Sequence, residues 1–240
     1  MVKHVRSDLR FKGSGSVKSK SDRQKRQGDT REDGVSGFSR NEIEFFRQFR
    51  KPYDIQDFLN KIEYNPGTVT NSPGNVIRNR KANCFEGALF AACALRMLGH
   101  QPLIVDMIAE NDDDHVVAIF KSGNHIGAVA KSNTTVLRYR EPVYNSLREL
   151  VMSYFDMYFN TLGQKTMRSY SKPVNLSRFD RYHWMTTGDD LVYIGDYLNK
   201  IQHKIVLSPK QKRQLSPVDA DLVKVCFAGS LDAGLYKPEK

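Results

Sequence analysis

The stretch NCFEGALFAACALRMLGH, residues 83–100, governs the architecture expected for this chain of 240 residues. Residues at helical spacing in it share one face: Cys84, Ala88, Ala91 or Ala92, and Leu95. Gly99 is a natural helix stop. The pattern therefore predicts a helix with Cys84 in its first turn.

Three apolar runs downstream predict β-strands, because they are short and rich in branched residues. They are PLIVDMIA at 102–109, HVVAIFK at 115–121 and HIGAVAK at 125–131. The link KSGN between the last two has the composition of a hairpin turn, so these strands are expected to pair antiparallel. TVLRYR, residues 135–140, predicts a further strand. Helical spacing then resumes at Val143, Leu147, Leu150, Val151 and Tyr154. The fold class expected is α+β, with a Cys-bearing helix packed on an antiparallel sheet.

Four segments are expected along the chain: 1–38, 39–72, 73–160 and 161–240. The first is predicted to be a disordered basic tail, since it has hardly any apolar periodicity and residues 1–40 hold +6 of the net charge of +10. The second is a helical lead-in, which begins at the capping-box pair Ser39 and Glu42 and continues into a second helical piece at 55–62. The third is the core.

The fourth segment is predicted to be an extension that packs on the core. GDDLVYIGDYLNKI at 188–201 predicts a helix, 209–217 is loop-like, and VKVCFAG at 223–229 predicts a strand.

Composition limits the class of protein. A hydrophobic fraction of 40% is ample for a buried core, and no apolar run is long enough for a membrane span or a secretory signal. Three cysteines are an odd count, which favours reduced thiols and a cytoplasmic location over a disulfide scaffold. The spacing of cysteines and histidines supports no zinc site, so no metal and no cofactor are predicted.

Cys84 is the candidate nucleophile, because unpaired amides and the helix dipole at a helix N-terminus lower the pKa of a thiol. A small buried hydrophobe is the competing interpretation of the same residue. Cys93, in the middle of the helix, and Cys226 are assigned to packing. His115 opens a strand directly after an acidic turn, and a strand that crosses behind the helix N-terminus brings imidazole to thiol. His115 is therefore the candidate base.

These segments resemble a known family. NCFEGALFAACALRMLGH followed by DDHVVAIFKSGNHIGAVAKSN is similar to the catalytic segment of the transglutaminase-like superfamily, related in arrangement to papain-like proteases and arylamine N-acetyltransferases. The resemblance covers roughly residues 78–133. It implies a papain-like core with Cys84 as nucleophile, His115 as base, and an orienting acid or amide at the far end of the next strand.

The chain departs from the family pattern at that third position, where no Asp is present. Asn133 is the expected replacement, since an amide oxygen can accept the imidazole N–H, and Ser132 is the alternative. A polar turn that closes the strand is the other interpretation, which would leave a dyad or a degenerate site.

Two charged clusters flank the candidate pair. Asp112, Asp113 and Asp114 are interpreted as a solvated turn, with an influence on the base or a bound cation as alternatives. Arg78, Arg80 and Lys81 either favour a thiolate or an anionic substrate, or form a solvated basic loop.

The function expected is thiol-dependent acyl transfer on a peptide or amide-bearing substrate, as a cysteine hydrolase or acyltransferase, away from membranes. The alternative is a non-catalytic binding or scaffolding module on a degenerate form of the same fold. Contact of the basic stretch KSKSDRQKR, residues 18–26, with nucleic acid or an acidic surface is a third hypothesis.

Overall fold

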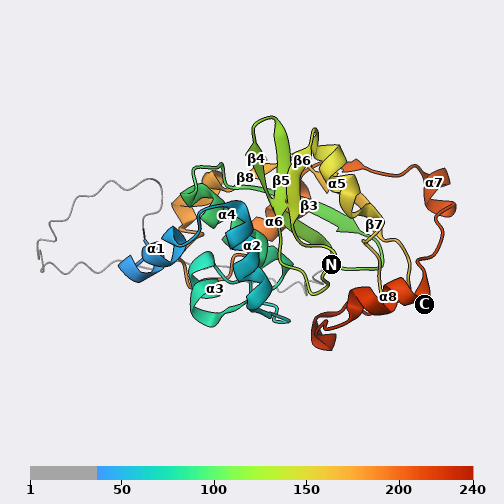
Figure 1. Ribbon diagram of the computed structural model, residues 1–240, viewed down its shortest axis with the longest axis horizontal. Helices are drawn as coiled ribbons and strands as arrows, with labels where there is room; N and C mark the ends of the chain where they lie inside the picture. The colour runs from blue at the N-terminus through green and yellow to red at the C-terminus, as the bar shows by residue number, and fades with distance from the viewer. Residues whose placement is uncertain (1–36, 240) are drawn as a thin grey trace, which may run out of the picture.

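The computed structural model describes residues 37–239, and the predicted contact segment at 18–26 lies outside that range. Figure 1 shows a mixed α and β arrangement, with helices on both sides of a central sheet. The helices are α1 (Arg40–Arg47), α2 (Pro52–Lys61), α3 (Pro73–Asn79), α4 (Cys84–Met97), α5 (Leu147–Phe155), α6 (Val192–Lys200), α7 (Pro209–Arg213) and α8 (Ala220–Phe227), with 3-10 helices η1 (Leu176–Tyr182) and η2 (Asp232–Gly234). The strands are β1 (Glu63–Tyr64), β2 (Lys81–Ala82), β3 (Leu103–Ala109), β4 (His115–Ser122), β5 (His125–Val129), β6 (Arg140–Tyr144), β7 (Met167–Ser171), β8 (Val174–Asn175) and β9 (His203–Ile205).

The main sheet has the strand order β6-β5-β4-β3-β7-β9, with β8 also paired to β3. All of its strand pairs are antiparallel. The predicted hairpin is confirmed, since Ser122 pairs with His125 and the ladder of β4 and β5 continues to Ala118 and Val129. Strands β7, β8 and β9 come from residues beyond 160, so the later part of the chain contributes to the same sheet as β3 and β4.

Helix α4 is the central helix of one layer, as its sequence predicts. Every residue from Glu86 to Leu95 is buried, because the helix is enclosed by the sheet on one side and by other helices on the other. Asn83 and Glu86 form a capping box at its start, and Gly99, with φ of +87°, follows its end. An apolar helix of this kind belongs in the core, where its burial stabilises the fold.

Two apolar clusters lie on opposite faces of the sheet. Along β4, Val116, Ala118 and Phe120 join the cluster that contains α4. Val117 and Ile119 alternate with them and join the cluster around α5. The sheet is therefore covered on both faces, and each face of β4 meets a different helix.

Two predicted strands are wrong. Residues 134–139 are irregular, and the edge strand β6 begins only at Arg140, where Pro142 is tolerated because an edge strand has a free side. Cys226 lies in helix α8 rather than in a strand. Asp219 caps that helix by accepting from the amides of Asp221 and Leu222, which stabilises helix over strand.

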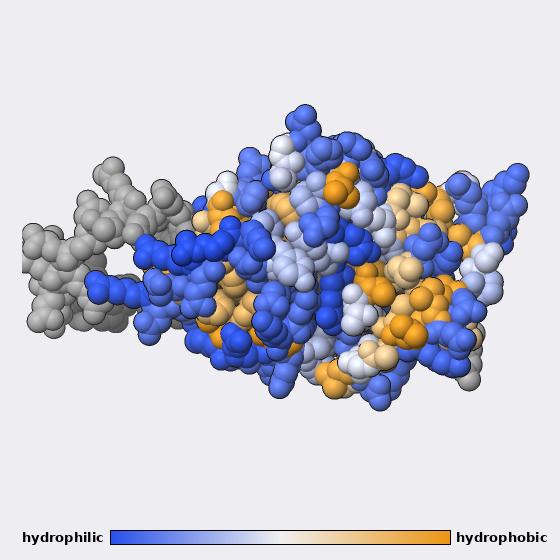
Figure 2. Space-filling view, in the orientation of Figure 1, coloured by the Kyte–Doolittle hydropathy of each residue, from blue (hydrophilic) through white to orange (hydrophobic). Residues whose placement is uncertain are grey.

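One of two short helices, α7, lies where a loop is predicted. Helices α3 and α7 both begin at a proline directly after a serine N-cap, Ser72 and Ser208, and each serine accepts a hydrogen bond from the amide three residues on. The predicted capping box of Ser39 and Glu42 is present at the start of α1, and α2 follows. Within residues 37–239, no helix has the length and apolar character needed to cross a membrane. Hydrophobic surface gathers mainly on the side of the molecule where α5 and α8 lie (Figure 2).

Candidate active site

Cys84 is the first residue of α4, directly after the N-cap Asn83. Its sulfur lies 3.7 Å from the carbonyl oxygen of Asp114, to which the thiol donates. The amides of Val116 and Phe85 also lie close enough to lower the thiol pKa by hydrogen bonding. The sulfur therefore lies beside the backbone of Asp114 and Val116, the two residues on either side of His115. This end of β4 extends beyond the part of the strand that pairs with β5.

The thiol of Cys84 is held in its neutral form in this conformation. Desolvation by the surrounding protein, followed by the negative charge of Asp113, raises its pKa to about 12, although the amides of Val116 in β4 and Phe85 in α4 act in the opposite direction. The residue is nevertheless partly exposed, whereas Cys93 and Cys226 are buried. Position at the helix start alone is thus not enough to generate a thiolate, because burial has the larger effect here.

His115 is buried and opens β4, and its ring lies between two tyrosines of the α5 side. The ring centroids of Tyr154 and Tyr158 each lie 6.3 Å from the imidazole, at steep angles. Nε2 of His115 lies 2.8 Å from the carbonyl oxygen of Leu137, so the proton belongs on this nitrogen. Burial lowers the pKa of His115 to about 4, although the Leu137 carbonyl favours the charged form. The imidazole is therefore neutral, with Nδ1 the unprotonated nitrogen.

A cavity of about 60 Å³ joins these two residues. Its lining is drawn from well-separated parts of the chain and includes Tyr64, Cys84, the acidic turn 112–114, His115, Ser132, Asn133, Leu137, Tyr158 and the segment around Gly234 to Tyr236. Cys84 reaches the cavity from α4, on one face of the sheet, and the His115 ring faces the α5 side. Both residues line the cavity at the end of β4, but the Cys84 thiol donates to the Asp114 carbonyl and the imidazole is bonded to the Leu137 carbonyl.

All four sequence-predicted site residues, Cys84, His115, Ser132 and Asn133, line this cavity, but the hydrogen bonds of their side chains go to other residues and not to one another. The side-chain amide of Asn133 pairs with the backbone of Leu231, and the Ser132 hydroxyl lies 3.1 Å from that of Thr134. The partner of the imidazole is the Leu137 carbonyl instead of the predicted amide of Asn133. A backbone carbonyl carries no sequence signal, so sequence patterns cannot reveal this contact.

Glu86 is a buried carboxylate below the candidate nucleophile that sequence reasoning missed. It accepts hydrogen bonds from the side-chain amide of Asn65 (2.9 Å to each oxygen), from the backbone and side chain of Asn71 (2.8 and 2.6 Å), and from the backbone of Asn83 (2.7 Å). These bonds fix the start of α4 and the loop before α3 together. The spacing of Asn83 and Glu86 is a capping-box signal that was available in the sequence.

Tyr64 adds a hydroxyl beside the nucleophile. Its pKa is raised by burial and then by the charges of Cys84, Asp113 and Glu86, while a hydrogen bond from the Cys84 amide opposes them. The Cys84 amide, which has no partner within the helix, therefore lies close enough to the Tyr64 hydroxyl to lower its pKa.

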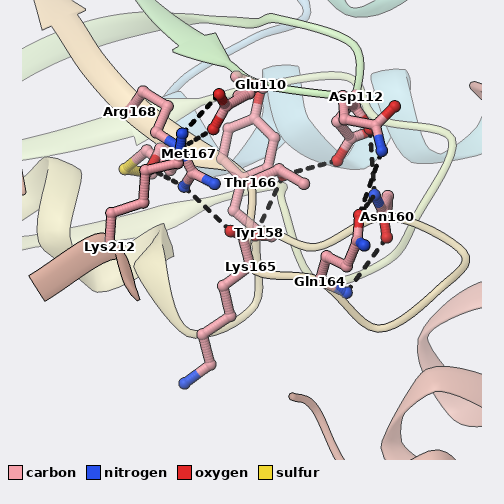
Figure 3. A network of polar contacts seen from close by, with 12 residues as sticks. Glu110, Asp112, Tyr158, Asn160, Gln164, Lys165, Thr166, Met167, Arg168 and Lys212 are labelled. Atoms are coloured by element: carbon pink, nitrogen blue, oxygen red, sulfur yellow. Dashed lines mark hydrogen bonds and ion pairs between the residues drawn. The ribbon is translucent and has the colours of Figure 1, made fainter. Parts of the chain in front are cut away.

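The acidic turn is only partly solvated, in contrast to the interpretation of its sequence. Asp113 is exposed, but Asp114 accepts from the amide of Ala109 at 2.8 Å, and Asp112 accepts from the hydroxyl of Thr166 at 2.7 Å. Burial raises the pKa of Asp112 to about 6. Figure 3 shows this turn tied to the strand β7 region through Thr166, with Tyr158 beside it. The hydroxyl of Tyr158 donates to the carbonyl of Asp113 at 2.7 Å.

The basic cluster before Cys84 does not line the cavity. Arg78 forms an ion pair with Glu42, and the guanidinium of Arg80 stacks on Phe58 at 4.7 Å. These contacts favour the structural interpretation of the cluster. Among residues 37–239, no group of three or more His, Cys, Asp and Glu side chains is arranged to hold a metal ion.

A second acid and base pair lies away from the cavity. Asp106 is buried in β3, where its amide donates to the hydroxyl of Ser171 and its carboxylate lies 3.1 Å from Nε2 of His203. This hydrogen bond raises the pKa of His203. The pair links β3 to the edge strand β9 across β7, which is a structural role.

Comparison with known proteins does not assign a family. No family model matches the chain, and no significant match to a curated protein sequence is found.

Proposed function

We propose that the protein is a thiol-dependent acyl-transfer enzyme of papain-like or transglutaminase-like architecture, with Cys84 as nucleophile and His115 as base. The observation that carries the proposal is the shared cavity, which is lined by a helix-initial thiol and by a strand-initial imidazole whose Nδ1 is unprotonated. The α+β fold, with an apolar helix on an antiparallel sheet, is compatible with that architecture.

The proposed reaction begins with transfer of the Cys84 proton to Nδ1 of His115. The thiolate then attacks an acyl carbon, and the oxyanion is held by the Cys84 amide once the Tyr64 hydroxyl has moved from it. The imidazolium returns its proton to the leaving amine as the C–N bond breaks, which leaves a thioester on Cys84. Water or an acceptor amine then releases the acyl group, so hydrolysis and transfer differ only in this second nucleophile.

The Leu137 carbonyl supports this assignment of roles. By accepting from Nε2–H it fixes the tautomer in which Nδ1 is free to act as base, the task that a side-chain carboxylate or amide performs in other thiol enzymes. A neutral carbonyl stabilises the imidazolium less than a carboxylate does, so a slow thiol enzyme is expected.

A non-catalytic binding module is the second candidate. It is favoured by the pKa values of the pair, because a thiol near 12 and an imidazole near 4 do not form an ion pair at neutral pH. On this alternative the cavity binds a ligand without reacting with it. The three free cysteines favour a reducing compartment such as the cytoplasm under either proposal.

Labelling with a peptide acyloxymethyl ketone separates the two candidates, since this electrophile needs an active thiol and an acidic partner. Enzyme function predicts one adduct per chain on Cys84, absent in Cys84→Ala and at least several-fold slower in His115→Ala. Cys93 and Cys226 are internal controls, because both are buried. Modification that falls on Cys93 or Cys226, or that proceeds equally in His115→Ala, would refute the enzyme assignment.

A further inference from the structure

A later segment of the same chain forms part of the cavity wall. Residues 230–239 follow α8 and include η2, and Gly234, Leu235 and Tyr236 contribute to the cavity lining. Figure 1 shows this last part of the chain returning beneath the end of the sheet. The candidate thiol and imidazole therefore share their cavity with a stretch of polypeptide from the same chain.

Two asparagines hold this segment by its backbone. The side chain of Asn133 donates to the carbonyl of Leu231 and accepts from its amide, both at 2.9 Å. The side chain of Asn111 does the same to Glu239, donating to its carbonyl at 2.9 Å and accepting from its amide at 2.7 Å. A side-chain amide has the same donor and acceptor pair as a peptide group, so each contact recognises backbone and not side-chain identity.

One position of the segment is selected by size. A Cβ built on Gly234 would lie 2.6 Å from Cε1 of Tyr64 and 3.1 Å from the amide nitrogen of Asn133. Any larger residue at 234 must therefore displace the Tyr64 ring or the segment itself. Tyr64 lines the same cavity as Cys84, so Gly234 packs against a residue of the candidate site.

We propose that residues 230–239 occupy the substrate groove, and that the site accepts a polypeptide segment held through its backbone by Asn133 and Asn111, with glycine beside Tyr64. This inference rests on the proposed function and names its substrate class, a glycine-containing peptide. The segment has to leave the groove before another peptide enters. Its departure also hydrates the Cys84 sulfur, which removes the desolvation that opposes thiolate formation.

The test measures how fast iodoacetamide modifies Cys84 in the full chain, by peptide mapping. Gly234→Val is expected to raise that rate by about tenfold or more, because the rate follows the fraction of molecules in which the segment is displaced. Gly188→Val is the matched control, since a Cβ added to Gly188 would meet no heavy atom within 4 Å. Asn133→Asp is the second variant, because it removes the donor to Leu231 and sets a carboxylate against that carbonyl without adding bulk.

A synthetic peptide with the sequence of residues 229–239, GSLDAGLYKPE, should restore protection of Cys84 in Gly234→Val. The same peptide with valine in place of the glycine that corresponds to Gly234 should not. Unchanged labelling in both Gly234→Val and Asn133→Asp, or protection that is equal for the two peptides, would overturn the proposal. Modification of Cys93 and Cys226 in Gly234→Val would show that this variant unfolds. In that case the labelling rate of Cys84 in Asn133→Asp alone tests the proposal. Alkylation by iodoacetamide needs no catalysis, so the labelling result holds even if the protein shows no acyl transfer. If instead the labelling result contradicts the role of residues 230–239, the catalytic roles of Cys84 and His115 are still tested separately by acyl transfer.

Discussion

Replacing Glu86 with glutamine should destabilise the start of α4 far more than the same change does at an exposed helix. The Glu86 carboxylate accepts from four N–H groups, on Asn65, Asn71 (two groups) and Asn83, and it is fully buried. Glutamine replaces one acceptor oxygen by an NH₂ group, so at least one buried donor then faces another donor. Each such group costs about 1–3 kcal/mol, and loss of the capping box adds about 1 kcal/mol, so the expected loss is about 3 kcal/mol.

The assay is the free energy of unfolding from urea denaturation, with Glu149→Gln as control. Glu149 has the same place in the first turn of α5 and accepts from the amide of Asn145 at 2.9 Å, but it is exposed. Its replacement should change stability by less than about 0.5 kcal/mol. If Glu86→Gln and Glu149→Gln lower the free energy of unfolding equally, then the buried Glu86 carboxylate does not fix the start of α4.

Two further predictions concern packing and pH. A Cβ added to Gly87 would lie 2.2 Å from the Cβ of Lys131, so Gly87→Ala should lower the free energy of unfolding by about 2 kcal/mol in the same assay. A Cβ added to Gly195 would lie at an ordinary 3.5 Å from the Phe85 ring, so Gly195→Ala should raise the free energy of unfolding by up to about 1 kcal/mol. The pKa of His115 is lowered to about 4 in the folded protein, so as the pH falls the unfolded chain is protonated at His115 before the folded protein is. The free energy of unfolding should therefore fall by about 3 kcal/mol as the pH drops from 6.5 to 4. His115→Gln should remove that part of the pH dependence; an identical loss in the variant would contradict the assignment.

The central elements could be predicted from sequence because each is an apolar run with clear ends. Helix α4 and the hairpin of β4 and β5 bury continuous apolar runs that end at glycine or at a polar turn. The run 223–229 has the composition of a strand, but it pairs with no strand of the sheet, and the Asp219 cap favours a helix. Tertiary context decided that case.

The candidate site could be predicted only in part, for a related reason. Cys84 and His115 follow from element starts, which sequence patterns mark well. The contact of His115 with the Leu137 carbonyl depends on an irregular backbone at 134–139. The place of the later segment in the cavity wall depends on contacts almost a hundred residues apart, between Asn133 and Leu231. Neither leaves a local pattern.

The most direct test of the central claim is to trap an acyl group on Cys84. The full chain is mixed with an activated acyl ester, quenched in acid and measured by intact-protein mass spectrometry, with Gly234→Val in parallel to expose the site. Thiol catalysis predicts one hydroxylamine-sensitive acyl group per chain, absent in Cys84→Ala and formed much more slowly in His115→Ala. An acyl group that persists in Cys84→Ala, or no acyl group in either wild type or Gly234→Val, would contradict it.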